Sequence, residues 1–287
     1  MKIALYHPAC RAADADPIEV YVRRLTTALA VDHQATLVTT PSALHHLMDR
    51  ERPEILHLHQ TAGLALARLL GSARAGQFDR VPVALTLHDY RLCCVATDLR
   101  HPDGHGCPPR LVCRMVASLN RSVTGSVGLV HSPSQHVLEQ HLQRGFFQRA
   151  AQVVLPYGSA PPWPASANAT NASEPVVIRS ASPGTAQLAI QDAFQIGALV
   201  IATRQGGIPE IVRDGVNGLL VEPGDEPAIA EAIERLRRSP ELAIRLRAEA
   251  GKTARLYDMA FHAAHLAEAY TRVIAANRVG PFFRKAA

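Results

Sequence analysis

The chain has 287 residues, of which 47% are hydrophobic and 19% charged, and its formal net charge is +5. This is the composition of a folded globular protein, and the length favours two domains. The sequence contains no run of 18 apolar residues, which argues against a transmembrane helix. Aromatic residues make up only 5% and are not interleaved with clustered basic residues, so we expect no nucleic-acid partner.

The N-terminal segment, the number of cysteines and the net positive charge together indicate a cellular compartment. The first residues run straight into a strand-like segment without the apolar core of a signal peptide, so we expect a cytoplasmic protein. The five cysteines are an odd number, which favours free thiols there. The mild positive excess suits an acceptor that carries phosphate, or peripheral contact with the inner face of an anionic membrane.

The first half, residues 1–157, alternates short apolar runs with helical periodicity. Asp16-Pro17 marks a helix start, and the spacing of Ile18, Val22 and Leu25 predicts one apolar helical face. A second helix is predicted after Ser132-Pro133-Ser134, whose hydroxyl groups can cap it. Strands are predicted at Lys2–Tyr6, Ala35–Thr40, Glu54–Leu58, Val81–Leu87, Val127–His131 and Gln152–Leu155. Buried strands that alternate with helices predict an α/β fold with a doubly wound parallel sheet.

The second half follows a segment, 158–175, that is rich in Ala, Pro, Ser and Asn and reads as a linker. Residues 176–287 then form a second, smaller domain in this interpretation. Its predicted strands are Val176–Ser180, Leu199–Thr203 and Gly218–Val221. Its predicted helices are Pro227–Arg238, Pro240–Arg255 and Ala260–Ala276, with Asp225 and Ser239 as N-caps of the first two.

The ordered elements of Gly197–Leu236 carry a family resemblance. A strand leads to Gly206-Gly207-Ile208-Pro209-Glu210, and Asp214-Gly215 and Asn217-Gly218 then turn the chain into the next strand. This segment resembles the C-terminal block of family-four glycosyltransferases, which are retaining enzymes of the GT-B fold. The resemblance implies an acceptor-side domain at 1–157 and a shortened, Rossmann-like donor-side domain at 176–287.

The first half resembles the same family independently. The segments Pro53–His59 and Leu85–Tyr90 are similar to the family's strands that end in His-x-His and Thr-x-His-Asp-Tyr. By resemblance, His88 is the catalytic residue that hydrogen-bonds the donor sugar, and Asp89 orients its ring. A histidine that only caps a strand end is the alternative for His88. Ligands of open α/β sheets bind at the carboxyl ends of strands, where both residues lie.

The donor site departs from the family pattern. Counting back from Gly197 places Asp192 at the second glutamate of the family's E-x7-E pair and Gly184 at the first. The carboxylate of Asp192 can still accept hydrogen bonds from the ribose hydroxyl groups, whereas Gly184 has only backbone groups with which to bind. Between them, Thr185, Gln187 and Leu188 are expected to contact sugar and phosphate through backbone N–H groups.

Two further departures concern phosphate. Asp16-Pro17 replaces the family's Gly-Gly loop, although Glu19 of the following helix is kept, so we expect Glu19 to remain a donor-side residue. The family's Arg and Lys clamp for the diphosphate has no counterpart, and Arg179 or Arg204 are the available substitutes.

The resemblance implies a transferase that uses a nucleotide-diphosphate sugar as co-substrate and no other cofactor, with a glycan, lipid or small-molecule acceptor. The alternative is an inactive relic that serves as a binding module.

One stretch, Arg91–Cys113, gathers thiols and imidazoles. Three soft ligands and a histidine can form a tetrahedral zinc site, but the spacing lacks a C-x2-C pair. Loose thiols in an acceptor loop are the favoured interpretation. The residues concerned are Cys93, Cys94, His101, His105, Cys107 and Cys113.

Overall fold

The computed structural model describes residues 1–8, 16–59, 81–94, 99, 111–159, 174–179 and 183–279, and it divides into two compact units. Unit 1 is Met1–Leu155 together with the C-terminal helix from Ala263 onward, and unit 2 is Pro156–His262. The sequence placed everything after residue 175 in the second domain. That prediction is wrong for the C-terminal helix, which packs on the first sheet.

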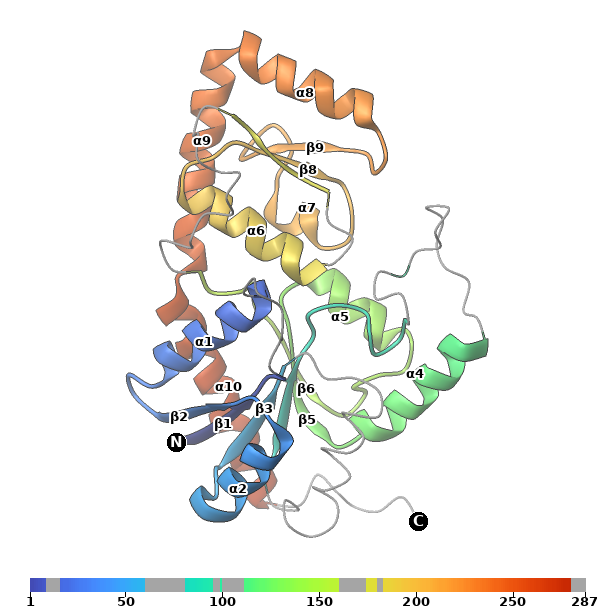
Figure 1. Ribbon diagram of the computed structural model, residues 1–287, viewed down its shortest axis with the longest axis vertical. Coiled ribbons are helices and arrows are strands. Elements are labelled where there is room, and N and C mark those ends of the chain that lie inside the picture. Colours follow the sequence, from blue (N-terminus) through green and yellow to red (C-terminus); the bar gives the residue numbers. More distant parts are fainter. Residues whose placement is uncertain are drawn as a thin grey trace. The chain divides into compact units, whose positions relative to one another are not determined.

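Unit 1 is built on a six-stranded parallel sheet with the strand order β2-β1-β3-β4-β5-β6 (Figure 1). The sequence predicted all six strands, and the observed bounds differ by no more than two residues at each end. The strands are β1 (Lys2–Tyr6), β2 (Gln34–Val38), β3 (Ile55–Leu58), β4 (Val83–Thr86), β5 (Val127–Ser132) and β6 (Ala151–Val154). The doubly wound parallel sheet is therefore confirmed.

The strand order decides which face each helix covers. The chain moves from β1 to β2 in one direction and then returns across β1 to β3. Because such crossovers are right-handed, α1 (Pro17–Leu29) and α2 (Pro41–Glu51) lie on opposite faces. The α2 face also holds α4 (Leu111–Thr124) and α5 (Gln135–Leu142), whose apolar side chains share one core with the strands. The sequence analysis did not predict α2 or α4.

The opposite face of the sheet is covered by the C-terminal helix α10 (Met259–Val279). His57 points to this face because its neighbours Leu56 and Leu58 belong to the core on the other side. Its ring meets the hydroxyl of Tyr270, and Val273 packs within 3.2 Å of where a Cβ on Gly128 would lie. These contacts hold α10 in unit 1.

Helix starts follow the predicted capping chemistry in most cases. The carboxylate of Asp16 accepts a hydrogen bond from the backbone N–H of Ile18, and Ser134 accepts one from Val137. Asp225 caps α8 (Glu226–Arg238) through the N–H of Ala228. Ser239 occupies the N-cap position of α9 (Pro240–Ala254), but its hydroxyl makes no capping bond.

Unit 2 contains a three-stranded parallel sheet in the order β7-β8-β9. Its strands are β7 (Val176–Ile178), β8 (Val200–Thr203) and β9 (Leu219–Val221). One core joins β8 to α6 (Pro183–Gln195), α7 (Ile208–Ile211) and α9, and a second core joins the sheet to α8. The sequence predicted these strands together with α8 and α9, but it missed α6. Most of the predicted linker, 158–175, lies outside the described residues.

The turn before β9 is held by one buried side chain. Asn217 accepts a hydrogen bond from the N–H of Arg213 and donates to the carbonyl of Ile211 and to the hydroxyl of Thr253. The next residue, Gly218, is closely surrounded: a Cβ there would lie 2.9 Å from a methyl group of Val212 and 3.0 Å from the carbonyl oxygen of Val200. The Asn-Gly pair is therefore needed for the fold of unit 2.

None of the helices in the described part of the chain is both long enough and apolar enough to cross a membrane.

The close packing at Gly218 predicts that Gly218→Ala destabilises unit 2 by about 1–3 kcal/mol, the usual range for overpacking. Gly251→Ala is the matched control, because a Cβ on Gly251 in α9 meets no atom within 4 Å. Alanine at that helical position is expected to raise stability by roughly 0.5–1 kcal/mol. Urea unfolding of both variants checks this, and equal effects of the two substitutions would contradict it.

Candidate active site

Five buried histidines gather at the carboxyl ends of the central strands of unit 1. His7 and His59 directly follow β1 and β3, and His88 follows β4 by two residues. The sheet changes winding direction between β1 and β3, and ligands of open α/β sheets bind at such a switch point. His57 in β3 and His131 in β5 lie in the layer beneath. The fold therefore places the predicted residue His88 where a ligand site is expected.

The lower layer is a continuous chain of hydrogen bonds. The Tyr270 hydroxyl lies 2.6 Å from Nδ1 of His57, and Nε2 of the same ring lies 2.7 Å from Oγ1 of Thr86. Thr86 in turn lies 3.0 Å from Nδ1 of His131, whose Nε2 is 2.8 Å from the carbonyl oxygen of Leu155. Four side chains from β3, β4, β5 and α10 thus form one buried polar line.

The carbonyl at one end fixes the direction of every bond in this line. A carbonyl can only accept, so Nε2 of His131 carries a proton, and Nδ1 of the neutral ring accepts one from Thr86. Thr86 then accepts from Nε2–H of His57, and Nδ1 of His57 accepts from the hydroxyl of Tyr270. The line is fully satisfied only while both imidazoles are neutral.

The upper layer holds His59 and His88. Nδ1 of His59 lies 3.1 Å from Nε2 of His88, and Nε2 of His59 is buried without a hydrogen-bond partner among the described residues. A buried N–H without a partner is rarer than a buried acceptor without one. The proton therefore lies on Nδ1 of His59, which donates to Nε2 of His88. His88 then carries its own proton on Nδ1, so His59 sets the tautomer of His88.

Burial keeps these rings uncharged. Desolvation, followed by the fields of neighbouring imidazoles, lowers the pKa of His57, His59 and His88 well below 6.5. Burial also lowers the pKa of His131 to about 4, although its bond to Leu155 acts in the opposite direction. The aromatic ring of Tyr21 in α1 packs against both His59 and His88, with ring centroids 6.1 Å apart in each case. The site is thus a neutral hydrogen-bonding surface at pH 7.

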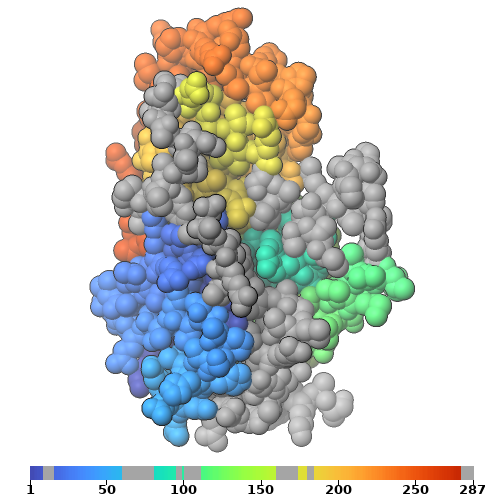
Figure 2. Space-filling view, in the orientation of Figure 1, coloured from blue at the N-terminus to red at the C-terminus, as the bar shows by residue number. Residues whose placement is uncertain are grey.

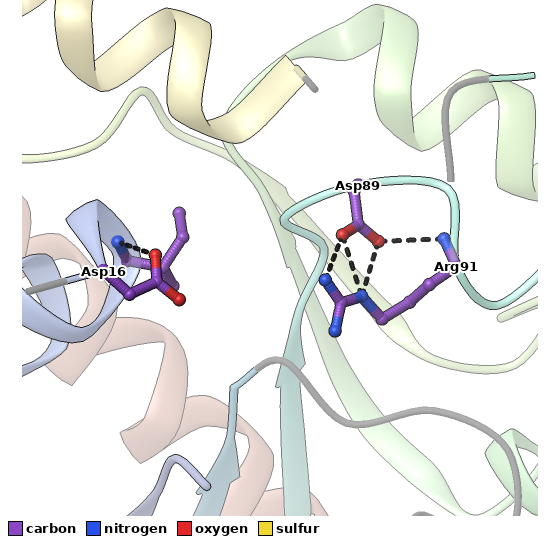
Figure 3. Close-up of polar contacts among 4 residues, drawn as sticks. Asp16, Asp89 and Arg91 are labelled. Carbon is purple, nitrogen blue, oxygen red and sulfur yellow. Dashed lines mark hydrogen bonds and ion pairs between the residues drawn. The ribbon is translucent and has the colours of Figure 1, made fainter. Parts of the chain in front are cut away.

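Asp89 does not orient the ring of His88, contrary to the prediction. Its carboxylate accepts bonds from the backbone N–H and from Nε of Arg91, at 2.8 and 2.9 Å, and forms an ion pair with the same guanidinium group (Figure 3). The reason is local: the chain turns directly after His88 and brings Arg91 back onto Asp89. Asp89 raises the pKa of Arg91, mainly by this hydrogen bonding, and Asp16 adds a smaller electrostatic contribution.

The predicted donor-side residues Gly184, Thr185, Gln187, Leu188 and Asp192 all lie on α6 of unit 2. Gly184 and Thr185 are in its first turn, where backbone N–H groups have no partner within the helix. Gln187 and Leu188 are buried, and Asp192 is half-buried with one carboxylate oxygen 3.4 Å from the hydroxyl of Ser159. The sequence found these residues by counting along a motif, without predicting the helix that carries them.

The predicted donor-side residue Glu19 lies in the first turn of α1 in unit 1. Its carboxylate accepts bonds at 3.0 and 2.7 Å from Nε and Nη2 of Arg23, one turn later. This i,i+4 ion pair is partly exposed, and such pairs contribute only a few tenths of a kcal/mol. Glu19 can therefore exchange this partner for a ligand hydroxyl at small cost.

Both arginines considered as substitutes for the phosphate clamp are already paired. Arg179 contacts Glu226 at 2.9 Å, and Arg204 contacts Glu222 at 3.1 Å and Asp214 at 3.3 Å. All these side chains are exposed, so the pairs are weak. The carboxylates nevertheless reduce the positive potential that a diphosphate would meet.

The cysteine stretch is only partly described. Cys93, Cys94 and Cys113 are free, whereas His101, His105 and Cys107 lie outside the described residues. Within the part that the structure describes, no group of three or more His, Cys, Asp or Glu side chains could hold a metal ion.

Comparisons with protein families match both halves of the chain. A family model described as "Glycosyl transferase 4-like domain" matches residues 4–158, and one described as "Glycosyl transferases group 1" matches residues 142–239. D-inositol 3-phosphate glycosyltransferases of Streptomyces griseus and Corynebacterium glutamicum are 35% and 37% identical over 37% and 32% of this chain. The alignments span only 19% to 22% of the lengths of the curated relatives.

Solved structures resemble the fold over nearly the whole chain. Sucrose-phosphate synthase from Thermosynechococcus elongatus has a TM-score of 0.71 at 16% identity and covers 96% of this chain and 99% of its own. HepE from Anabaena, solved in complex with UDP-glucose, has a TM-score of 0.64 at 14% identity and covers 95% of this chain and 100% of its own. At these identities the likeness concerns the fold alone.

The hydrogen-bond line predicts a specific loss on removal of the Tyr270 hydroxyl. Tyr270→Phe leaves Nδ1 of His57 buried without a donor, which is expected to destabilise unit 1 by about 1–3 kcal/mol. Tyr257→Phe is the control at a second buried tyrosine, because the Tyr257 hydroxyl makes no hydrogen bond within the described residues. Chemical unfolding of both variants measures the difference, and an equal loss would contradict the line.

The neutral histidines also predict acid sensitivity. Their folded pKa values lie below 6.5, so the unfolded chain binds protons first as the pH falls, and stability is lost from about pH 6.5 downward toward pH 4. Each such histidine contributes roughly 1.4 kcal/mol per pH unit within that window. Unfolding at pH 7.5, 6.5 and 5.5 tests this above the range in which carboxylates titrate. Unchanged stability across these three values would contradict the buried neutral state.

Proposed function

We propose that this chain transfers a sugar from a nucleotide-diphosphate sugar to an acceptor. It belongs to the group 1 glycosyltransferases with a glycosyl transferase 4-like domain, because family models cover residues 4–158 and 142–239. Its fold is of the GT-B type, like that of its structural neighbours. The observation that carries the proposal is His88, held neutral at the carboxyl end of β4 within the matched family segment.

The donor side of the proposal rests on α6. Its first turn offers the backbone N–H groups of Gly184 and Thr185 to a diphosphate, and helix N-termini favour such anions. Asp192, two turns later, offers a carboxylate to the ribose hydroxyls. Structures of HepE in complex with UDP and with UDP-glucose support a uridine donor as the first choice to test.

His88 acts by hydrogen bonding rather than by charge in this proposal. A neutral imidazole with its proton on Nδ1 can donate a hydrogen bond to a sugar hydroxyl beside the reacting carbon without repelling positive charge that develops there. His59 holds its tautomer through the 3.1 Å contact. Transfer proceeds with retention, as the family resemblance implies, and the leaving phosphate takes the acceptor's proton. Since Asp89 is engaged by Arg91, it supports the turn after His88 rather than the ring.

The acceptor, a glycan, lipid or small molecule, binds unit 1. The protein acts in the cytoplasm in this proposal, with a peripheral contact at the inner face of the membrane. The second candidate is an inactive binding module. It is favoured by the glycine at position 184 and by the carboxylate partners of Arg179 and Arg204, because a leaving diphosphate without cationic support reacts slowly.

Donor binding is tested by thermal unfolding with UDP, GDP and UDP-glucose. A ligand at about 100 times its Kd is expected to raise Tm by roughly 5 °C through mass action. Asp192→Ala should weaken binding roughly 10- to 100-fold, as expected for loss of bonds to a charged group. Glu231→Ala, an exposed carboxylate on α8 without an ion pair in the described chain, is the control and should bind normally. An unchanged Tm with every nucleotide at millimolar concentration would refute the transferase proposal and favour the inactive binding module.

Turnover is tested by following release of UDP from UDP-glucose. His88→Ala should retain the UDP-induced shift but lose at least about 100-fold in rate, since it removes a bond made at the reacting carbon. The anomeric configuration of the released glucose, read by NMR at early times, reports retention. A His88→Ala variant that turns over like the wild type would refute its catalytic role, and an inverted product would refute the retaining mechanism.

A further inference from the structure

Unit 1 contains a cavity of about 690 Å³ that the proposed reaction does not use. It lies between α4, the end of α5 and the loop that follows His88. Asn120 of α4 donates a 2.8 Å bond to the carbonyl of Leu92, which ties the cavity wall to that loop. Its described lining combines apolar side chains, thiols and three arginines, namely Arg114, Arg121 and Arg144.

The three guanidinium groups keep most of their donors for a ligand. Arg121 donates one bond to the carbonyl of Arg144, at 3.1 Å, and Arg144 donates from Nη1 to Gln140. Arg114 has no hydrogen-bond partner in the described part of the chain. Within that part, none of the three pairs with a carboxylate, in contrast to Arg91 and Arg204. Five N–H donors per guanidinium suit a phosphate group.

The buried Cys93 thiol in the wall does not offset this positive charge. The thiol of Cys93 donates to the carbonyl of Tyr90, and burial raises its pKa to about 12. It is therefore uncharged at neutral pH, although the nearby Arg144 acts to lower its pKa. The wall thus presents the neutral Cys93 thiol beside cationic guanidinium groups.

The outer face of α4 is apolar and continues into the cavity. Leu111, Val112, Met115 and Leu119 expose 73%, 60%, 65% and 42% of their surface. At 100° per residue they span about 100° of the helix circumference. Leu111 and Met115 also line the cavity, so the stripe and the cationic pocket are one surface. Figure 2 shows α4, in green, at the outer edge of unit 1.

We propose that this surface binds an anionic phospholipid: the phosphate headgroup enters the cavity between the three arginines, and the apolar stripe of α4 lies in the bilayer interface. An amphipathic helix with arginines beside an exposed apolar stripe is suited to that position. The inference rests on the proposed function, which includes a membrane contact. It deepens that proposal because it assigns the contact to named residues close to the loop after His88.

The test is co-sedimentation of the full chain with phosphatidylcholine vesicles that contain or lack phosphatidylglycerol. The wild type is expected to bind the anionic vesicles and to lose binding as salt is raised. Each arginine near an anionic surface contributes roughly fivefold, so Arg114→Gln with Arg121→Gln should weaken binding roughly 30-fold. The control is Arg237→Gln with Arg245→Gln, which removes the same charge from exposed positions on α8 and α9 and should change little.

Two further variants keep the test sharp. Arg114→Gln alone disturbs no described contact and should still weaken binding roughly fivefold, even if Arg121→Gln affects folding. Leu111→Ser with Met115→Ser should reduce binding at high salt, where the charge contribution is screened.

Absence of wild-type binding to anionic vesicles would overturn the inference, as would equal losses in the arginine variant and its control. A thermal shift with inorganic phosphate but no vesicle binding would overturn it in favour of a soluble phosphate ligand. Failure of vesicle binding with an intact UDP-induced shift overturns this inference alone. The reverse outcome overturns the proposed function alone.

Discussion

The buried line from Tyr270 through His57, Thr86 and His131 to the carbonyl of Leu155 is the interaction on which unit 1 depends. It joins the C-terminal helix to the three central strands, and every donor in it has an acceptor. Because buried polar groups are tolerated only when satisfied, the line requires neutral imidazoles and the presence of α10. The layer above it contains His59, whose ring packs against that of His57, and His88. Burial keeps these two rings uncharged as well.

The segment that best identifies the family serves mainly to hold unit 2 together. Asn217 satisfies three backbone and side-chain groups around its turn, and Gly218 admits no side chain. The residues proposed to bind the donor lie earlier, on α6. This motif block and the fold of unit 2 can therefore stay intact when the residues proposed to bind the donor on α6 differ from the family pattern. Recognition of the family and retention of activity are separate questions for this reason.

Charge is distributed unevenly over the described arginines. Arg91, Arg179 and Arg204, which lie near the strand ends of their units, are each paired with carboxylates. Arg114, Arg121 and Arg144 keep their charge and face a cavity beside an apolar helix. The neutral proposed catalytic surface and this cationic pocket share the loop after β4. The fold thus separates the place proposed for sugar chemistry from the place proposed for an anionic group.

The sequence alone determined the parallel sheet, because buried strands and turns are recognised from short local runs of apolar and turn-forming residues. It also placed His88 at a strand end and identified Asp16, Ser134 and Asp225 as caps, since capping is local. Only the tertiary structure decided that α10 packs on the first sheet, that Asp89 binds Arg91 and that His59 sets the tautomer of His88. These outcomes depend on side chains brought together by folding. The pairing of Tyr270 with His57, 213 residues apart, leaves no local signal in the chain.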